Sequence, residues 1–231
     1  MIDDDHPTRV QIAAAATRLF ATSGYGGVSL RAIAAEAGVQ LSLIPYHFGS
    51  KAGLYRAIWA SWMGRVPAAA LLKRRALPQS ASLNARVRAV VTAFFDGPRS
   101  LLLGKKGGAD FVAIMVREAH DPSAVGRGLL DEFIRPNGRK IVAELAGLLP
   151  MLHPQEFTVG RQMMVSALRI VIEQDRQPRS GLSDVAEVDR LFSILVDYVT
   201  RGWLGLAAQS AIAKVAKTAA THGSIRRYSN R

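Results

Sequence analysis

Apolar residues recur along most of the chain with the period of one face of an α-helix. In the first such segment they follow the spacing i, i+3, i+4, i+7 and i+8, at Ile12, Ala15, Ala16, Leu19 and Phe20. This stripe predicts an amphipathic helix. Gly24 is its predicted end, because glycine readily takes the backbone conformations that terminate helices.

The next segment combines two short helices with a glycine turn. Ser29 is a good N-cap for a second helix whose apolar positions repeat the same spacing, and Gly38 closes it. A short third helix must fit between Gly38 and Gly49. A longer helix is expected to begin after Ser50.

Breaker residues divide the rest of the chain. Proline, glycine and serine gather at five joints, which predict helix ends: "LPQSAS", "DGPRS", "DPS", "LLPMLHPQE" and "QPRSGLS". No segment alternates like a strand, so the sequence predicts an all-α fold. Residues 184–213 form the longest helical pattern, and the basic stretch after Lys217 predicts a disordered tail. The expected units are a reader (1–50), a larger helical domain (51–217) and the tail (218–231).

Composition narrows the class of protein. Of the 231 residues 49% are hydrophobic, which is ample for a core. No stretch approaches the roughly 20 apolar residues of a membrane-spanning helix. The acidic N-terminus is unlike a secretory signal. The chain has no cysteine, which excludes disulfides and Cys nucleophiles. We therefore expect a cytoplasmic protein without a membrane partner.

The positive charge of the chain is unevenly placed. The formal net charge is +12, which favours a polyanionic partner. Residues 1–60 are nearly neutral, however, and the excess lies in 61–110 and 201–231. Bulk charge therefore does not indicate where DNA would bind, and the placement of single residues must.

Residues 29–49 fit a helix-turn-helix, whose second helix enters the DNA major groove. Small residues are needed where the two helices cross, and Ala34, Ala37 and Gly38 meet this requirement. Three positions are expected to face the core: Val39, Ile44 and Phe48. Five are expected to face outward: Gln40, Leu41, Ser42, Tyr46 and His47.

The stretch "VSLRAIAAEAGVQLSLIPYHFGSKAGLY" resembles the N-terminal module of the TetR family of bacterial transcriptional repressors. The positions in register with that family are Ser29, Ile33, Ala34, Ala37, Gly38, Val39, His47, Phe48, Lys51 and Leu54. The resemblance covers about residues 8–58. It implies a homodimer that binds a double-stranded DNA operator, with a ligand-binding and dimerisation domain behind the reader.

Three positions depart from the family pattern. Gln40 replaces the usual Ser or Thr, Ser42 replaces a frequent Gly, and Pro45 replaces a Tyr that contacts phosphate. Pro45 has no N–H to donate to the carbonyl of Leu41, so the recognition helix should be short, kinked or largely one turn. The lost contact could pass to Tyr46.

Eight residues are candidates for DNA contacts: Ser29, Arg31, Gln40, Leu41, Ser42, Tyr46, His47 and Lys51. Lys51 falls in the first turn of a helix, a place suited to a bound phosphate. The alternative for Lys51 is a solvated lysine. For His47 the alternative is a buried histidine that braces the next helix.

The larger domain offers weaker signals. Six residues are candidates for a ligand pocket: Trp62, Phe94, Phe111, Met115, Arg117 and Met164. Apolar stripes of this kind also occur in plain core. Arg117 could meet an anionic ligand, or pair with Glu118 or Asp121. Residues 110–148 vaguely resemble the regulatory domain of the CecR-type branch of the family, through Arg117-Glu118 before a proline and a later Ile-Arg-Pro.

No feature points to an enzyme. "GKKGG" lacks the spacing of a phosphate-binding loop, and no Gly-x-Ser-x-Gly elbow is present. The five histidines are scattered, with no metal-ligand spacing, so neither a metal nor a cofactor is expected.

We expect a repressor that an unidentified small-molecule effector releases from its operator. The effector would favour a state in which the two reading heads are spaced differently. The dimer is expected to pair the apolar faces of residues 160–176 and 186–208. The alternative is a helical small-molecule carrier or enzyme with a vestigial reader.

Overall fold

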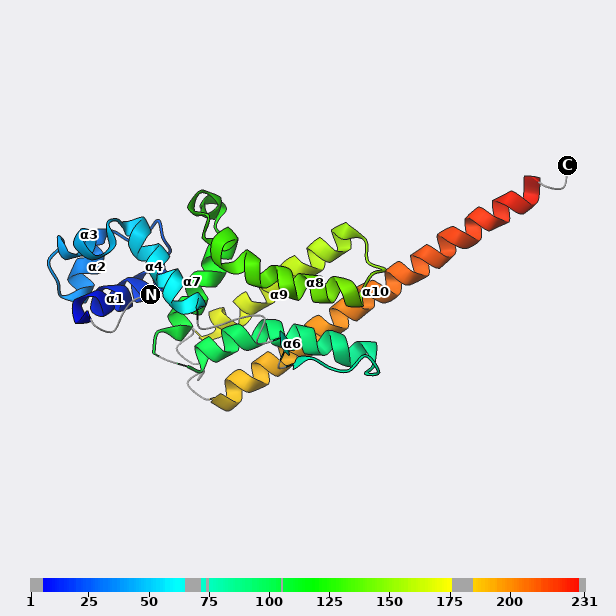
Figure 1. Ribbon diagram of the computed structural model, residues 1–231, viewed down its shortest axis with the longest axis horizontal. Helices are drawn as coiled ribbons and strands as arrows, with labels where there is room; N and C mark the ends of the chain where they lie inside the picture. The colour runs from blue at the N-terminus through cyan, green and yellow to red at the C-terminus, as the bar shows by residue number, and fades with distance from the viewer. Residues whose placement is uncertain (1–5, 65–71, 74, 105, 176–184, 229–231) are drawn as a thin grey trace.

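A computed structural model of the protein describes residues 6–64, 72–73, 75–104, 106–175 and 185–228. Every regular element in these ranges is a helix, which confirms the all-α prediction. The first helices form a small unit at one end of the molecule, and the long last helix crosses the body and extends beyond it (Figure 1).

The small unit has the helices that the sequence predicts. They are α1 (Pro7–Ser23), α2 (Leu30–Ala37), α3 (Leu43–Phe48) and α4 (Lys51–Met63). The side chain of Ser29 caps α2 by accepting the N–H of Ala32 at 3.1 Å, and Ser50 caps α4 by accepting the N–H of Gly53 at 3.0 Å. The predicted helix starts are therefore confirmed at the level of single hydrogen bonds.

The larger part of the protein contains the remaining elements. They are α6 (Leu83–Leu102), α7 (Gly108–His120), the 3₁₀-helix η1 (Pro122–Arg127), the π-helix η2 (Leu130–Ile134), α8 (Arg135–Leu148), α9 (Pro154–Asp175) and α10 (Val185–Tyr228). α6 packs against α7, α8 and α10, and α9 packs against α7 and α10. The small unit joins this bundle through α1 on α7 and α4 on η2.

The prediction of a helix end at "DGPRS" is wrong. α6 runs through this stretch with Pro98 in its interior. Proline in a helix interior costs about 3 kcal/mol, but Gly97 and Pro98 are both buried here. The carboxylate of Asp96 also accepts two hydrogen bonds from Arg75, at 2.8 and 3.1 Å. Burial and this ion pair hold the helix together where local sequence favours a break.

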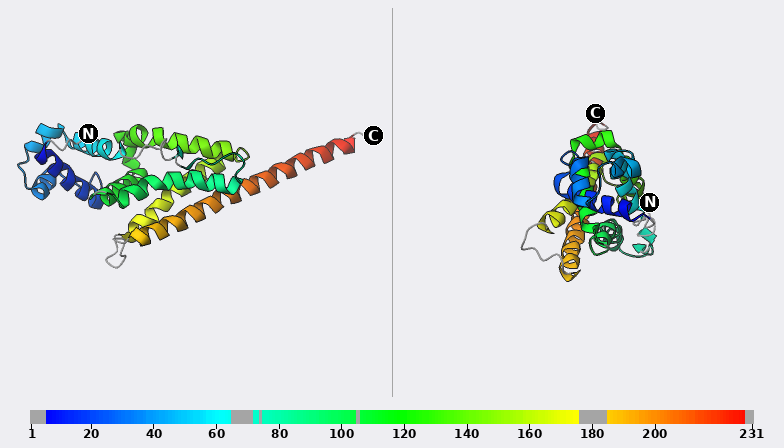
Figure 2. Two further views of the ribbon diagram at one scale, coloured as in Figure 1. Left: turned by 60° about the horizontal axis from the view of Figure 1, so that its bottom comes forward. Right: turned by 90° about the vertical axis from the view of Figure 1, so that its left-hand side faces the viewer.

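The segment expected to form the tail, residues 218–231, begins as a continuation of the last helix. α10 continues to Tyr228, so residues 218–228 are helical, while 229–231 lie outside the described residues. The last part of α10 stands clear of the body in two orientations (Figures 1 and 2). Extending an existing helix needs no new nucleus, so the packed first half of α10 can support its continuation.

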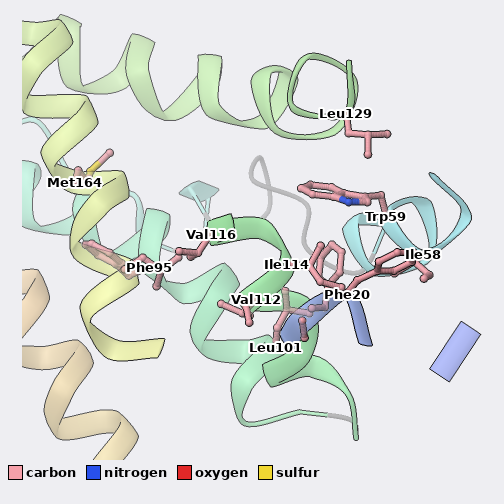
Figure 3. Packing of buried hydrophobic residues seen from close by; sticks show 14 of the residues in the cluster. Phe20, Ile58, Trp59, Phe95, Leu101, Val112, Ile114, Val116, Leu129 and Met164 are labelled. Carbon is pink, nitrogen blue, oxygen red and sulfur yellow. The ribbon is translucent and has the colours of Figure 1, made fainter. Parts of the chain in front are cut away.

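One continuous hydrophobic core joins the small unit to the bundle. Figure 3 shows Phe20 of α1 and Trp59 of α4 beside Ile114 of α7, with Leu129 above them and Phe95 of α6 further along. All five side chains are buried. The reader is therefore packed onto the bundle rather than tethered to it.

Among the described helices, residues Val185–Lys214 of α10 are long and apolar enough to cross a membrane by length and composition. Within the most apolar window, 39% is buried inside the protein. Val188, Phe192 and Trp203 are among the buried side chains. One such helix is weak evidence for a membrane span, because a helix that contributes to a protein core passes the same test.

Gly160 of α9 lies close to Trp203 of α10, and this contact allows a test of how the two helices pack. A Cβ atom on Gly160 would lie 2.8 Å from two ring carbons of buried Trp203, whereas one on Gly205 of α10 would meet nothing within 4 Å. Gly160→Ala should lower the free energy of unfolding by about 1–2 kcal/mol through overpacking. Gly205→Ala should raise it by up to about 1 kcal/mol. Thermal unfolding of both variants checks this, and a shift of the same sign for both would contradict it.

Candidate nucleic-acid interface and internal cavity

The turn between α2 and α3 is fixed by backbone hydrogen bonds. Gly38 has φ +63°, in the left-handed region, and its N–H donates to the carbonyl of Ala35 at 3.1 Å. The N–H of Val39 donates to the carbonyl of Ala34 at 3.0 Å. This pattern closes α2 and sets the direction in which the chain enters α3.

Pro45 lies in the first turn of α3, where helix N–H groups have no partner within the helix. The carbonyl of Leu41 accepts from the N–H of Ile44 at 3.2 Å instead, and that of Gln40 accepts from Leu43 at 3.1 Å. These i→i+3 bonds satisfy the group that an ordinary residue at position 45 would have bonded. α3 has six residues, which confirms the prediction of a short recognition helix.

The side chains of α3 divide as predicted between core and solvent. Ile44 is fully buried, and Val39 and Phe48 are partly buried against the same core. Four of the five residues expected to face outward are exposed: Gln40, Leu41, Ser42 and Tyr46, with Tyr46 at 81% and Leu41 at 42%. The fifth, His47, is half-buried. The turn before α3 and α3 itself therefore expose these side chains, while Ile44 anchors the helix in the core.

The remaining sequence-predicted contacts surround this face. Arg31 on α2 is exposed. The hydroxyl oxygen of Ser29 is engaged as the cap of α2. His47 is half-buried, with its ring centroid 5.0 Å from that of Tyr46 and 6.4 Å from that of His6. His47 therefore lies at the edge of the surface, between the two roles that the sequence left open.

Lys51 is positioned by an aromatic ring. Its Nζ lies 4.4 Å from the ring centroid of Tyr25, which favours a cation–π interaction. Partial burial, with the nearby Arg127, lowers the pKa of Lys51 below its usual value. The ammonium is half-buried at the first residue of α4 rather than freely solvated.

Sequence reasoning missed Arg9. Its guanidinium carbon lies 5.2 Å from the ring centroid of Phe48, next to α3, and its Nε is buried with no hydrogen-bond partner. A signal was available, because Arg9 lies three residues before Ile12 and seven before Ala16, on the apolar stripe of α1. A charged residue on an apolar stripe suggests a specific partner, and here that partner is the ring of Phe48.

A buried carboxylate joins the reader to the bundle. Glu118 of α7 is only 2% exposed. Its Oε2 accepts from the hydroxyl of Tyr55 on α4 at 3.0 Å, and Arg127 of η1 donates to both of its oxygens at 2.8 Å. Burial, together with Glu118, raises the pKa of Tyr55. We call Tyr55, Glu118 and Arg127 the junction triad.

Further hydrogen bonds surround the junction triad, and they show that Arg117 does not pair as the sequence suggested. Arg127 also donates to Asp121, and bonds from Ser123 and Arg127 lower the pKa of Asp121 to about 2. Arg117 pairs with neither Glu118 nor Asp121; its Nε donates to the carbonyl of Ala21 at the end of α1, at 2.9 Å. The cation that pairs with these carboxylates is Arg127, which the sequence did not single out.

The bundle contains a cavity of about 140 Å³ that is partly open to solvent. The residues that line it come from α4, α6, α7, η2, α8 and α9: Met63, Ala93, Phe94, Gly97, Pro98, Leu101, Met115, Val116, Ala119, Leu130, Ile134, Gly138, Ile141, Val165 and Leu168. The cavity lies on the side of α7 away from Arg117 and Glu118. α7 therefore has one face on the cavity and another on the reader.

Two of the six predicted pocket residues line this cavity, Phe94 and Met115. Phe111 is instead fully buried between Trp59 and Trp62, with ring centroids at 5.3 and 5.6 Å, and Met164 is core. Arg117 bonds to α1, as described above. The spacing of large apolar residues does not separate core from cavity. The signal that was missed is the set of small residues that leave the space open: Ala93, Gly97, Ala119 and Gly138.

The single turn η2 contacts both the cavity and α4, the helix that follows the reader. Leu130 and Ile134 line the cavity. The ring of Phe133, on the same turn, stacks on Trp59 of α4 with centroids 6.2 Å apart. Glu132 forms an ion pair with Arg56 of α4 at 2.7 Å. A change in the cavity walls thus has a direct mechanical path to α4, and π-helical turns are frequent at functional sites.

Comparison with known proteins finds two family models that match different parts of the chain. The family model described as "Bacterial regulatory proteins, tetR family" matches residues 12–58, and a "Tetracyclin repressor-like, C-terminal domain" model matches residues 88–202. A search of curated proteins finds no significant match.

Solved structures show the same fold. A TetR-like transcriptional regulator from Rhodococcus sp. RHA1 is 20% identical, with a TM-score of 0.55 over 86% of this chain and 96% of its own. A HlyIIR mutant protein is 21% identical, with a TM-score of 0.53 over 84% and 97%. The fatty acid degradation regulator FadR from Bacillus halodurans is 16% identical, with a TM-score of 0.52 over 84% and 97%. At these identities the likeness concerns the fold.

The position of Pro45 in the first turn predicts a small effect of its replacement. Pro45→Ala should change the free energy of unfolding by less than about 1 kcal/mol, because α3 loses no hydrogen bond to the proline. Ile44→Ala, next to it and fully buried, should cost about 2–5 kcal/mol. Chemical denaturation measures both. A gain of about 3 kcal/mol for Pro45→Ala would mean that the proline strains the helix.

The junction triad predicts that two tyrosine-to-phenylalanine variants differ in their free energy of unfolding. Tyr55→Phe removes the hydroxyl that donates to buried Glu118 and should lower the free energy of unfolding by about 1–2 kcal/mol. Tyr25→Phe is the control, because Tyr25 contacts the junction through its ring. Its effect should stay within about 0.5 kcal/mol. Equal losses for the two variants would show that the bond to Glu118 contributes nothing.

Proposed function

Because the chain belongs to the tetR family of bacterial regulatory proteins, we propose that it is a transcriptional repressor whose α2–α3 unit binds an operator and whose cavity binds the effector that releases it. This proposal rests mainly on one observation, which is that η2 contacts both the cavity and α4. Leu130 and Ile134 line the cavity, while Phe133 and Glu132 contact α4.

The outward face of α3 is the proposed reading surface. Gln40, Ser42 and Tyr46 would reach base edges, and Leu41 would contact a thymine methyl or sugar. Ser29, Arg31, His47 and Lys51 surround this face and would contact phosphates, which position a protein but carry little sequence information. Arg9 is added to this set because it lies beside Phe48 of α3.

The proposed release mechanism uses α4 as a lever. α4 begins next to α3 at Lys51 and is held by the junction triad and by η2. An effector that fits the cavity better when η2 and α7 are displaced would shift the population toward a reader orientation that does not match the operator. The matched families are regulators, which supports this proposal over a carrier or enzyme with a vestigial reader.

Three finer assignments also remain proposals. The boundary between reader and bundle is placed at residues 50 and 51, where Ser50 caps α4. The CecR-type resemblance of residues 110–148 is carried by its sequence cues alone: Arg117-Glu118 near the end of α7, and Ile134-Arg135-Pro136 where η2 meets α8. The cytoplasm is the compartment in which such a regulator would meet its operator.

A homodimer is the proposed active form. Apolar side chains are exposed on α9 at Met163 and on α10 at Ile194, Tyr198 and Ile212. The three on α10 share one face, because Tyr198 is four residues from Ile194 and Ile212 is eighteen, close to whole turns of helix. Pairing this face across a two-fold axis would form a four-helix interface and space two reading heads about one DNA turn apart.

The phosphate role of Lys51 predicts a change in salt dependence. Lys51→Ala should weaken binding to all DNA sequences about equally and reduce the slope of log K against log salt by about one unit per reading head. Lys140→Ala, which removes an exposed cation on α8, is the control and should leave the slope unchanged. Fluorescence anisotropy over a salt series measures both. An unchanged slope with an altered base preference would assign Lys51 to base contact.

The dimer interface predicts a change in assembly. Ile194→Glu should convert the dimer to a monomer at micromolar concentration, because it places a charge on a face that pairing would bury. Val125→Glu, on η1 at 89% exposure, should leave the dimer intact. Sedimentation velocity separates the two states. A wild-type monomer that still binds its operator would contradict the proposed interface.

A further inference from the structure

The cavity in the bundle has walls of one chemical kind. All fifteen lining residues are Ala, Gly, Pro, Val, Leu, Ile, Met or Phe. None of these side chains carries a hydroxyl, an amide or an ionisable group. A ligand in this space would therefore meet van der Waals contacts and no side-chain hydrogen bond.

Three charged side chains close to cavity residues in sequence already have partners. On α7, Glu118 is bound by Tyr55 and Arg127, and Arg117 by the carbonyl of Ala21. On α6, Asp96 is bound by Arg75. Turning any of them toward a ligand would break an existing bond and leave a partner unsatisfied.

His120 is the remaining polar neighbour on α7, next to Ala119. Its Nδ1 lies 2.7 Å from the carbonyl oxygen of Val116, and its Nε2 lies 3.3 Å from the hydroxyl oxygen of Ser166. Both ring nitrogens are thus in contact with protein groups. No charged or hydrogen-bonding side chain is among the fifteen residues that line this cavity.

Such walls discriminate strongly by charge. Burying an ion without a partner costs several kcal/mol, whereas each buried methylene gains about 0.8 kcal/mol. The volume limits size as well. At about 140 Å³ the space is close to that of an engineered apolar cavity of about 150 Å³ that binds benzene.

We propose that the effector of this regulator is a compact, uncharged, hydrocarbon-like molecule of about the size of one substituted benzene ring. This inference rests on the proposed function, since it names the chemistry of the ligand that the cavity would sense. It excludes molecules that rely on a carboxylate, a phosphate or an amine for binding.

The test is a matched ligand series on the full chain. Ethylbenzene, phenylacetate and 2-phenylethylamine share one skeleton and carry no charge, a negative charge and a positive charge. Isothermal titration without DNA should show ethylbenzene binding, with the two charged analogues at least about 100-fold weaker. Dodecanoate is included as a long-chain acid and should also bind at least about 100-fold more weakly than ethylbenzene.

Two variants confirm where the ligand sits. Ala93→Leu should fill the cavity and abolish ethylbenzene binding. Met115→Lys replaces a half-buried residue and is expected to fold; it should invert the selectivity in favour of phenylacetate by giving it a cation. Val125→Lys adds the same charge on η1, away from the cavity, and should leave the wild-type order unchanged.

The outcomes separate this inference from the proposed function. Wild-type protein that binds phenylacetate, 2-phenylethylamine or dodecanoate as tightly as ethylbenzene would overturn the inference, as would no binding of ethylbenzene. DNA binding would then still support a regulator. Ethylbenzene binding that disappears in Ala93→Leu would support the inference even if the protein bound no DNA, and in that case the proposed function would fail instead.

Discussion

The packing of the small unit on the bundle depends on the hydrogen bonds that the buried carboxylate of Glu118 accepts. Glu118 lies in the interior, where an unpartnered charge would cost several kcal/mol. It is stable there because Arg127 and Tyr55 bind it from η1 and α4. Three separate elements must therefore meet at one point. Breaking any bond of this junction triad leaves a buried group unpaired, so the reader has a strongly preferred orientation on the bundle.

The same helix that carries Glu118 forms a wall of the cavity, and this arrangement links two functions without a long path. Met115 and Val116 face the cavity while Glu118 faces the reader, and η2 repeats the pattern with Ile134 and Phe133. Packed side chains rearrange in discrete steps, since interiors are dense. A ligand that changes the position of α7 or η2 must therefore change how α4 is held.

Local signals in the sequence predicted the reader well, and they failed where distant contacts decide. The side chains of Ser29 and Ser50 each accept the N–H of the residue three positions later, and such local caps can be predicted from sequence alone. α6 continues through Pro98, where Gly97 and Pro98 are buried and Asp96 is paired with Arg75, twenty-one residues earlier in the chain. Local rules cannot see such a partner. For the same reason the large apolar residues of the bundle could be recognised as buried but not sorted between core and cavity wall.

Pro45 shows how a departure from a family pattern can leave a fold intact. A proline disrupts a helix when a carbonyl loses its donor, and here the carbonyl of Leu41 receives the N–H of Ile44 instead. The 3₁₀-like turn before α3 is therefore part of the accommodation. Because Pro45 itself is exposed on the outward side, its consequence lies in the shape of the reading surface rather than in stability. Tyr46, 81% exposed beside it, is then the aromatic group that the proposed reading surface would present to DNA.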